Sequence, residues 1–228
     1  MNDIKFRHEL KHFINYSDYL QIRNRIRFVA KIDKASGSNE KYKIRSLYFD
    51  NLYDKALLEK LNGINNREKF RIRFYNDDTS FIRLEKKCKI NGLTQKQGTR
   101  ITEDECTKII NNDLDWIKNS KNALLLEFYS KSNYLLLKPK TIVDYVRIAY
   151  IYEPGNVRIT FDMDVKSGLY SKDLFEKDLP SINSIEGNSI ILEVKYDEFL
   201  PQIITDLIQT NNRQATAISK YASCRIYG

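Results

Sequence analysis

Charged side chains recur at every second position in several segments of this sequence, where they could bind an anionic ligand. Within each segment, Arg, Lys, Glu or Asp alternates with apolar residues. The alternating charged positions are Arg7, Glu9 and Lys11; Arg71 and Arg73; Arg83, Glu85, Lys87 and Lys89; Arg158, Asp162 and Asp164; and Glu193 and Lys195. Arg and Lys bind phosphate groups, and Arg can do so through two parallel hydrogen bonds. Carboxylates repel phosphate, so the acidic residues fit either ion pairs that hold the bases in place or ligands of Mg²⁺ or Mn²⁺.

The alternation has a period of two residues, which predicts β-strands. The expected strands cover residues 6–13, 42–50, 69–75, 81–89, 141–152, 157–165 and 190–196. For a single strand, this pattern is typical of an antiparallel sheet with one face in water.

Amphipathic segments between these strands predict helices. They cover residues 18–29 with Ser17 as the cap, 52–61, 103–110, 121–137, 198–209 and 215–226. Thr102, followed three residues later by Glu105, forms the pattern of a capping box. Strands in groups with helices between the groups indicate an α+β fold, and we expect a single domain over residues 1–228.

Two arrangements of the charged faces fit this pattern. If the helices cover the apolar face of the sheet, the charged face must look elsewhere, and a sheet closed on itself would place that face in the lumen. A lumen lined by Arg and Lys would repel itself when empty and would be stable around a polyanion. A curved open sheet with a wet concave face fits the periodicity equally well.

The composition indicates an anionic partner and a reducing compartment. Lys and Arg number 38 against 30 acidic residues, so the formal net charge is +8. The cysteines Cys88, Cys106 and Cys224 are isolated from one another, which favours free thiols over a disulfide framework or a zinc site. We expect a cytoplasmic protein, because the sequence has neither a signal peptide pattern nor the ~18-residue apolar run of a membrane helix.

The motifs, taken in order, resemble the VTC domain, the polyphosphate polymerase domain of vacuolar transporter chaperone complexes, which belongs to the triphosphate tunnel metalloenzymes or CYTH superfamily. The resemblance extends from Phe6 to about Tyr227. The motifs are Arg7-His8-Glu9-Leu10-Lys11, Ser46-Leu47-Tyr48-Phe49-Asp50, Arg71-Ile72-Arg73-Phe74-Tyr75, Leu84-Glu85-Lys86-Lys87, Tyr145-Val146-Arg147, Val157-Arg158-Ile159, Leu192-Glu193-Val194-Lys195 and Ser219-Lys220-Tyr221. Eukaryotic complexes add an SPX domain and membrane helices, whereas this chain resembles a stand-alone, bacterial-type member.

The resemblance implies a fold and a set of site residues. The fold would be an antiparallel β-barrel tunnel of about eight strands, with helices packed outside and a C-terminal helix closing one end. The catalytic phosphate ligands would be Lys11, Arg71, Arg73, Lys87, Arg147 and Arg158. Further substrate-binding residues would be Lys89, Lys96, Tyr145, Lys195, Ser219 and Lys220. Glu193 would hold Mn²⁺ or Mg²⁺, and Glu85 is expected to form salt bridges.

One departure from the wider superfamily concerns the first strand. Classical members open with glutamate-x-glutamate-x-lysine, whereas Arg7 stands at the first glutamate position here, as in the VTC branch. This difference favours the polymerase branch over a hydrolase with several metal-binding carboxylates. It also leaves the roles of Arg7 and Glu9 open.

The function implied is a metal-dependent transfer of the terminal phosphoryl group of ATP to a growing inorganic polyphosphate chain, with release of ADP. A tripolyphosphatase or nucleoside triphosphatase in the same tunnel is the first alternative, and a polyphosphate-binding module without turnover is the second. Nucleic-acid binding is disfavoured, because it would place aromatic rings among the bases for stacking. Here the neighbouring aromatic residues Phe6, Phe70, Phe74 and Phe161 fall on the opposite, apolar face.

Overall fold

The computed structural model describes residues 6–33, 40–187, 189–209 and 214–226. It divides into two compact units, each built from three stretches of the chain. Unit 1 comprises residues 1–43, 145–165 and 185–218, and unit 2 comprises residues 44–144, 166–184 and 219–228. The single domain expected from the sequence stays a prediction.

An antiparallel sheet runs through the described part of the chain, with its strands in the order β1-β10-β8-β7-β3-β4-β5-β6. These strands are β1 (His8–Ile14), β3 (Lys41–Asp50), β4 (Arg67–Tyr75), β5 (Asp78–Ile90), β6 (Leu93–Ile101), β7 (Lys138–Tyr152), β8 (Val157–Ser167) and β10 (Ile190–Tyr196). Two short strands, β2 (Lys31–Ile32) and β9 (Ile182–Asn183), pair with β7 and β8 respectively.

Helices lie between groups of strands along the chain, so the predicted α+β class is confirmed. They are α1 (Tyr16–Ile26), α2 (Lys55–Leu61), α3 (Glu103–Ile110), α4 (Ala123–Leu135), α5 (Gln202–Ile208) and α6 (Lys220–Ile226). Short 3₁₀ turns cover Asp115–Asn119 and Pro154–Asn156.

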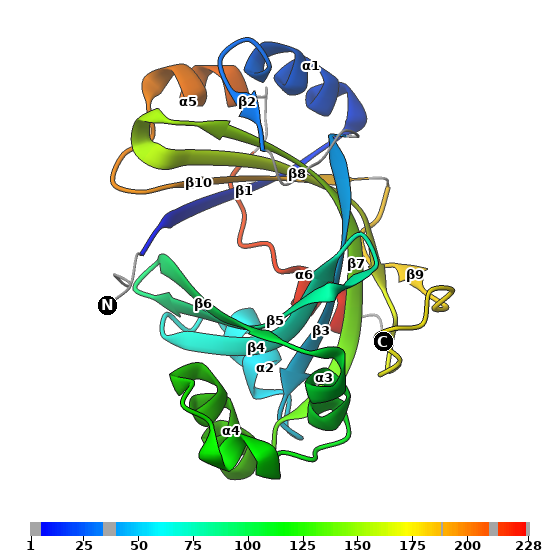
Figure 1. Cartoon of the computed structure of the whole chain (residues 1–228). Helices are drawn as coiled ribbons and strands as arrows, with labels where there is room; N and C mark the ends of the chain where they lie inside the picture. Colours follow the sequence, from blue (N-terminus) through cyan, green and yellow to red (C-terminus); the bar gives the residue numbers. More distant parts are fainter. Residues whose placement is uncertain (1–5, 34–39, 188, 210–213, 227–228) are drawn as a thin grey trace. The chain divides into compact units, whose positions relative to one another are not determined.

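In unit 1, helices α1 and α5 cover one face of strands β1, β10 and β8 (Figure 1). Ile22 and Ile26 are one turn apart on α1, and both are fully buried together with Ile204 of α5. They pack against the apolar face of the strands, which includes Phe161 and Leu192. Since successive side chains of a strand point to opposite faces, the charged residues of these strands face away from α1 and α5.

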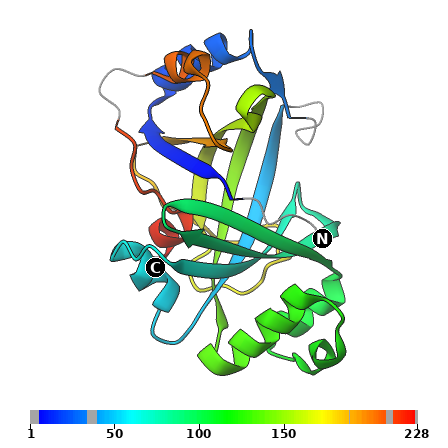
Figure 2. The same cartoon turned by 90° about the vertical axis from the view of Figure 1, so that its left-hand side faces the viewer.

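In unit 2, helices α3 and α4 lie on one side of strands β4, β5 and β6 (Figure 2). Phe128 of α4 is in edge contact with Phe49 and Phe70, with ring centroids 5.3 Å apart in both pairs. Leu84 of β5 and Ile109 of α3 belong to the same core. The alternating charged residues Arg71 and Arg73 of β4 and Glu85 and Lys87 of β5 again occupy the opposite face of the strands.

The seven predicted strands are confirmed with small shifts of their ends, but β6 was not predicted. This strand carries polar residues on both faces, so it lacks the alternation that revealed the others. Asn91 and Gly92 connect β5 to β6 with φ angles of 47° and 86°. An Asn-Gly pair with positive φ at both residues is a strong hairpin signal, and it could have revealed this strand.

Several predicted helix ends were wrong for local reasons. Asn15, not Ser17, caps α1, because its side chain accepts from the Asp18 amide at 2.8 Å while the Asp18 carboxylate accepts from the Asn15 amide. Helix α5 begins after Pro201, since a proline disfavours helical backbone at the residue before it. Residues 214–219 precede α6 without helical structure, and the Thr216 amide donates to the Lys11 carbonyl at 2.8 Å. By contrast, the capping box of Thr102 and Glu105 is confirmed.

Candidate phosphate-binding site

Unit 1 contains a set of charged side chains that we call the carboxylate cluster. Its members are Glu9 and Lys11 of β1, Glu193 and Lys195 of β10, Asp162 of β8 and Arg147 of β7. The register of the strands brings most of them together, because Lys11 lies opposite Glu193 and Glu9 lies opposite Lys195. Arg158 of β8 is the next residue across from Lys195.

Lys11 lies between two carboxylates. Its Nζ is 3.1 Å from Oε1 of Glu9 and 3.5 Å from Oε2 of Glu193, and it donates to the Ile218 carbonyl at 3.2 Å. The other oxygen of Glu193 is 2.7 Å from Nζ of Lys195. Burial alone would lower the pKa of Lys11, but the charges of Glu9 and Glu193 outweigh it and raise the pKa above its ordinary value. Lys11 is therefore held as a cation within the unit.

The pKa of Lys195 moves in the opposite direction. Burial is the largest cause and lowers it, and the nearby charge of Arg147 lowers it further, whereas Glu193 and Glu9 raise it. Two lysines that share Glu193 thus differ in how firmly they keep their protons.

The two predicted arginines of unit 1 form ion pairs with aspartates, each through two of its N–H groups. Nε and Nη2 of Arg147 donate to Asp162 at 2.6 and 2.8 Å, and the Arg147 guanidinium lies 5.4 Å from the ring centre of Tyr145. Nε and Nη2 of Arg158 donate to one oxygen of Asp33 at 3.1 and 2.8 Å, and Nη2 also donates to the Tyr42 hydroxyl at 2.9 Å. Because these partners lie on distant segments of the chain, the sequence pattern did not predict them.

Unit 2 contains a second set, the cation cluster, formed by Tyr48, Lys69, Arg71, Arg73, Glu85, Lys87 and Lys96. The strand register arranges it in rows. Tyr48, Arg71 and Glu85 are successive partners across β3, β4 and β5. Lys69, Lys87 and Lys96 are successive partners across β4, β5 and β6.

Glu85 is the anchor of the first row, and it makes the salt bridges expected of it. Nε and Nη2 of Arg71 donate to its Oε2 at 2.9 and 2.7 Å, and Nζ of Lys96 donates to its Oε1 at 3.0 Å. Nη1 of Arg71 donates to the Tyr48 hydroxyl at 2.9 Å, so Arg71 is held on two sides. Burial alone would raise the pKa of Glu85, but Arg71, Arg73 and Lys96 lower it well below its usual range.

The same cations act on Tyr48, which is 3% exposed. Burial would raise the pKa of its hydroxyl, but Arg71, Lys69 and Arg73 lower it to about 7. The positive potential of the cluster is thus strong enough to favour a phenolate near neutral pH.

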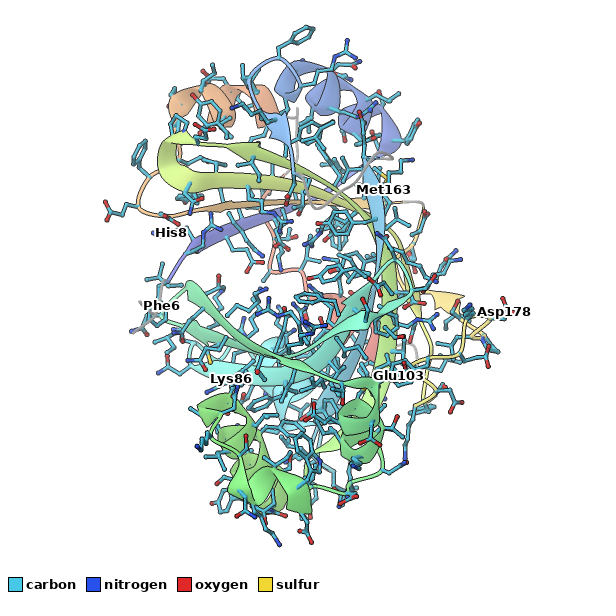
Figure 3. The ribbon with its side chains drawn as sticks, viewed as in Figure 1. Phe6, His8, Lys86, Glu103, Met163 and Asp178 are labelled. Atoms are coloured by element: carbon cyan, nitrogen blue, oxygen red, sulfur yellow. The ribbon has the colours of Figure 1, made fainter. Side chains whose placement is uncertain are left out.

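The remaining predicted residues of unit 2 have varied surroundings. Nε of Arg73 donates to the Ser46 hydroxyl at 2.9 Å. Lys89 lies further along β5, opposite Arg67 on one side and Thr94 on the other. Lys86 occupies the other face of β5 (Figure 3), where it pairs with Glu68 at 3.1 Å and with Glu127 of α4.

The C-terminal helix joins the cation cluster through its first residues. Ser219 and Lys220 stand at the start of α6, and the Ser219 hydroxyl accepts from Nζ of Lys69 at 3.4 Å. The Tyr221 hydroxyl donates to the buried Asp50 carboxylate at 2.7 Å. The same carboxylate accepts from the amides of Ala56 and Leu57 at the start of α2. Lys69 was missed in the sequence analysis, although its place two residues before Arg71 fits the alternation.

Arg7 does not belong to either cluster as defined above. Its Nε is 3.0 Å from the Asp197 carboxylate, and its Nη2 donates to the Lys195 carbonyl at 3.5 Å and to the Asn156 carbonyl. This arginine therefore ties the start of β1 to the end of β10.

The carboxylate cluster fits a divalent cation that is shared with substrate. Within the described residues, no group of three or more His, Cys, Asp or Glu side chains forms a metal site. However, Mg²⁺ is usually held by one or two carboxylates together with substrate phosphates, and Glu193 and Glu9 both contact Lys11. This donor set suits such a shared ion and not an all-protein cage.

Other features of the described residues bear on the predictions made from composition. No helix in the ranges that the structure describes is long and apolar enough to cross a membrane. Cys88, Cys106 and Cys224 are all buried free thiols.

Solved structures show what class of fold this is. HpAC1 from Hippeastrum, proposed as an adenylyl cyclase and found to have a dominant triphosphatase activity, matches with a TM-score of 0.57 at 13% identity, over 98% of this chain and 96% of that one. A protein from Bacillus halodurans, also proposed as an adenylate cyclase, matches with a TM-score of 0.50 at 12% identity, over 90% of this chain and 87% of that one. The likeness confirms the predicted triphosphate tunnel fold.

The family follows from the sequence itself. The VTC domain model matches residues 6–226, so the chain belongs to the VTC domain family. No sequence among the curated proteins gives a significant match.

Proposed function

We propose that this chain is a metal-dependent polyphosphate polymerase, which transfers the terminal phosphoryl group of ATP to inorganic polyphosphate and releases ADP. The observation that supports it best is the cation cluster, where Arg71, Arg73, Lys87 and Lys96 share one face of adjacent strands with Glu85, which pairs with Arg71 and Lys96. Membership of the VTC family supports an action on triphosphate-type substrates.

The proposed chemistry needs positioning and charge stabilisation more than proton transfer. A terminal oxygen of the polyphosphate would form a bond to the γ-phosphorus of ATP, and the bond from that phosphorus to the β,γ-bridging oxygen would break. The attacking oxygen is already anionic, so no general base is required. In this proposal the phosphates are bound by Lys11, Arg71, Arg73, Lys87, Arg147 and Arg158, with Lys89, Lys96, Tyr145, Lys195, Ser219 and Lys220 as further substrate ligands.

Glu193 would hold the divalent cation, Mn²⁺ or Mg²⁺, with Glu9 as a second possible ligand. When bound, such an ion neutralises charge on the donor phosphates. Lys11 and Lys195 pair with the two oxygens of Glu193, and both lysines would bind substrate phosphate in a protein whose Glu193 holds the ion. Arg147 would keep its bidentate pair with Asp162 and use its other N–H groups, because a guanidinium has five.

A tripolyphosphatase is the second candidate, and one observation favours it. HpAC1 shares the fold and has a dominant triphosphatase activity. The same residues would cleave triphosphate if water took the place of the acceptor phosphate, so the two reactions differ in the acceptor alone.

The product made from ATP decides between these candidates. We expect the purified protein, given ATP and Mn²⁺, to produce ADP and chains that stain as polyphosphate on a gel and give the internal-phosphate signal in phosphorus NMR. Orthophosphate as the sole product from ATP would contradict the polymerase and support the hydrolase. Binding of tripolyphosphate without turnover would support a binding module.

A further inference from the structure

We propose that Lys69 is a further phosphate-binding residue and that it links the bound phosphate chain to helix α6. This inference rests on the proposed function, because it takes a phosphate chain as the ligand. Three independent features of unit 2 support it.

The first feature is the row of lysines. Lys69 lies directly opposite Lys87, which lies directly opposite Lys96, on three neighbouring strands. Like charges directly opposite each other on a sheet destabilise the strand pairing. A chain of phosphates laid along this row would reverse the sign of that effect, because each lysine would then face an anion. Lys87 and Lys96 are already proposed ligands, and Lys69 extends their row by one strand toward β3.

The second feature is the packing of the Lys69 side chain against two aromatic rings. Its Nζ is 5.1 Å from the ring centre of Tyr48 and 5.6 Å from that of Tyr221, and the two rings stack with centroids 5.0 Å apart. Both distances are within the range of cation–π attraction. The two rings therefore orient the Lys69 ammonium, whereas Lys96 in the same row donates to the Glu85 carboxylate.

The third feature is the connection to α6. Nζ of Lys69 donates to the Ser219 hydroxyl at 3.4 Å, and the amide of Ala222 donates to the same hydroxyl at 3.3 Å. Tyr221 also belongs to α6 and bonds Asp50. Lys69 therefore connects the row of lysines to the start of the C-terminal helix. Phosphate bound at Lys69 would stabilise the start of α6 through Ser219 and Tyr221.

The test uses the full chain and inorganic tripolyphosphate, with binding measured by isothermal titration calorimetry. Lys69→Met keeps an unbranched stem over the rings and removes the charge, so we expect affinity to fall by about 10-fold or more, the value of a hydrogen bond to a charged group. Lys69→Arg should restore most of the affinity. Lys118→Gln is the matched control, because Lys118 is 51% exposed in unit 2 and pairs with Asp115, and its affinity should not change.

A second readout separates binding from a purely structural role. Hydrogen exchange of residues 219–226 should slow when tripolyphosphate is added to the wild-type chain, and this slowing should be lost in Lys69→Met but kept in Lys69→Arg. Unchanged affinity in Lys69→Met, together with weakened affinity in Lys87→Gln, would overturn the inference and leave the proposed function intact. Wild-type protein that binds no tripolyphosphate would overturn both. If Lys69→Met does not fold, a loss of affinity in folded Lys69→Gln supports the inference and unchanged affinity overturns it.

Discussion

The basic side chains have different partners in the carboxylate cluster of unit 1 and in the cation cluster of unit 2. In unit 1, Lys11, Lys195 and Arg147 each contact a carboxylate, and two of them share Glu193. In unit 2, Arg71 and Lys96 share Glu85, while Arg73 and Lys69 donate to the hydroxyls of serines.

The difference shows in the local electrostatics. Carboxylates raise the pKa of Lys11 in unit 1, whereas cations lower the pKa of Tyr48 to about 7 in unit 2. In the proposed function, the first environment would hold a divalent cation and the second would bind phosphate. Two faces built by the same alternation along the chain can thus have different preferences, according to the number of acids among the bases.

The largest effect should come from Glu193→Gln. It removes the carboxylate proposed to hold the metal ion, so phosphoryl transfer from ATP with Mn²⁺ should fall by about 1,000-fold, corresponding to the several kcal/mol that a metal ion contributes. Tripolyphosphate binding, measured without metal, should persist because the cation cluster is unchanged. Glu153→Gln is the control, since Glu153 is 79% exposed and pairs with Lys31. Full activity in Glu193→Gln would contradict the proposal that the carboxylate cluster holds the metal ion while the cation cluster binds phosphate.

The next effect concerns Glu85→Gln. Removing this buried charge leaves Arg71 and Lys96 without their shared carboxylate, and the free energy of unfolding should fall by about 3 kcal/mol, as for other broken buried pairs. Urea unfolding would measure the loss, and added tripolyphosphate should reduce it by supplying anions. Glu127→Gln is the matched control on the other face of β5, because Glu127 also contacts two lysines but is 32% exposed. Equal losses of unfolding free energy in the two variants would contradict the conclusion that the buried charge of Glu85 stabilises the fold more than that of Glu127.

The pH dependence of stability should report on Tyr48. Its folded pKa of about 7 is below the ordinary value of 10.0, so the unfolded chain binds more protons between these values and this contribution to stability increases with pH. The contribution is fully present above pH 10 and disappears as the pH falls through 7. Relative to Tyr48→Phe, the wild type should gain about 2 kcal/mol between pH 7 and pH 9. A difference that stays constant over this range would mean that the cations do not act on Tyr48 as described.

The smallest effect should come from Arg7→Gln. The Arg7 side chain pairs with Asp197 and with backbone carbonyls, and partly exposed pairs of this kind contribute about 0–1 kcal/mol. Tripolyphosphate affinity should change by less than about 3-fold, the fold-change that corresponds to well under 1 kcal/mol. A larger loss in calorimetry would place Arg7 among the phosphate ligands and extend the cation-rich character into unit 1.

The sequence was most informative where a pattern is local. Alternation along β4 and β5 was sufficient to predict the strands and their charged face, and the salt bridges of Glu85 were one of the two roles that it left open for the acids. The capping box of Thr102 and Glu105 was also readable, because both partners lie within one turn.

Contacts between distant segments could not be read in this way. Asp33 pairs with Arg158, and Lys69 meets Ser219 across 150 positions of the chain. Alternation shows which face of the strand a side chain occupies, but not which residue of another segment it contacts. The role of Glu9 was open for a different reason: Lys11 lies on the same strand, and their contact depends on the conformations of two long side chains, which alternation does not determine.

Asp50 connects two helices that are far apart in the sequence. One carboxylate accepts from the amides of Ala56 and Leu57 in α2 and from the hydroxyl of Tyr221 in α6, a residue 171 positions away. Segments that hydrogen-bond to the same buried carboxylate should open together, as one cooperative unit of local unfolding. The start of α2 and helix α6 should therefore have the same local stability. Any force or protease that detaches α6 should expose the start of α2 in the same event.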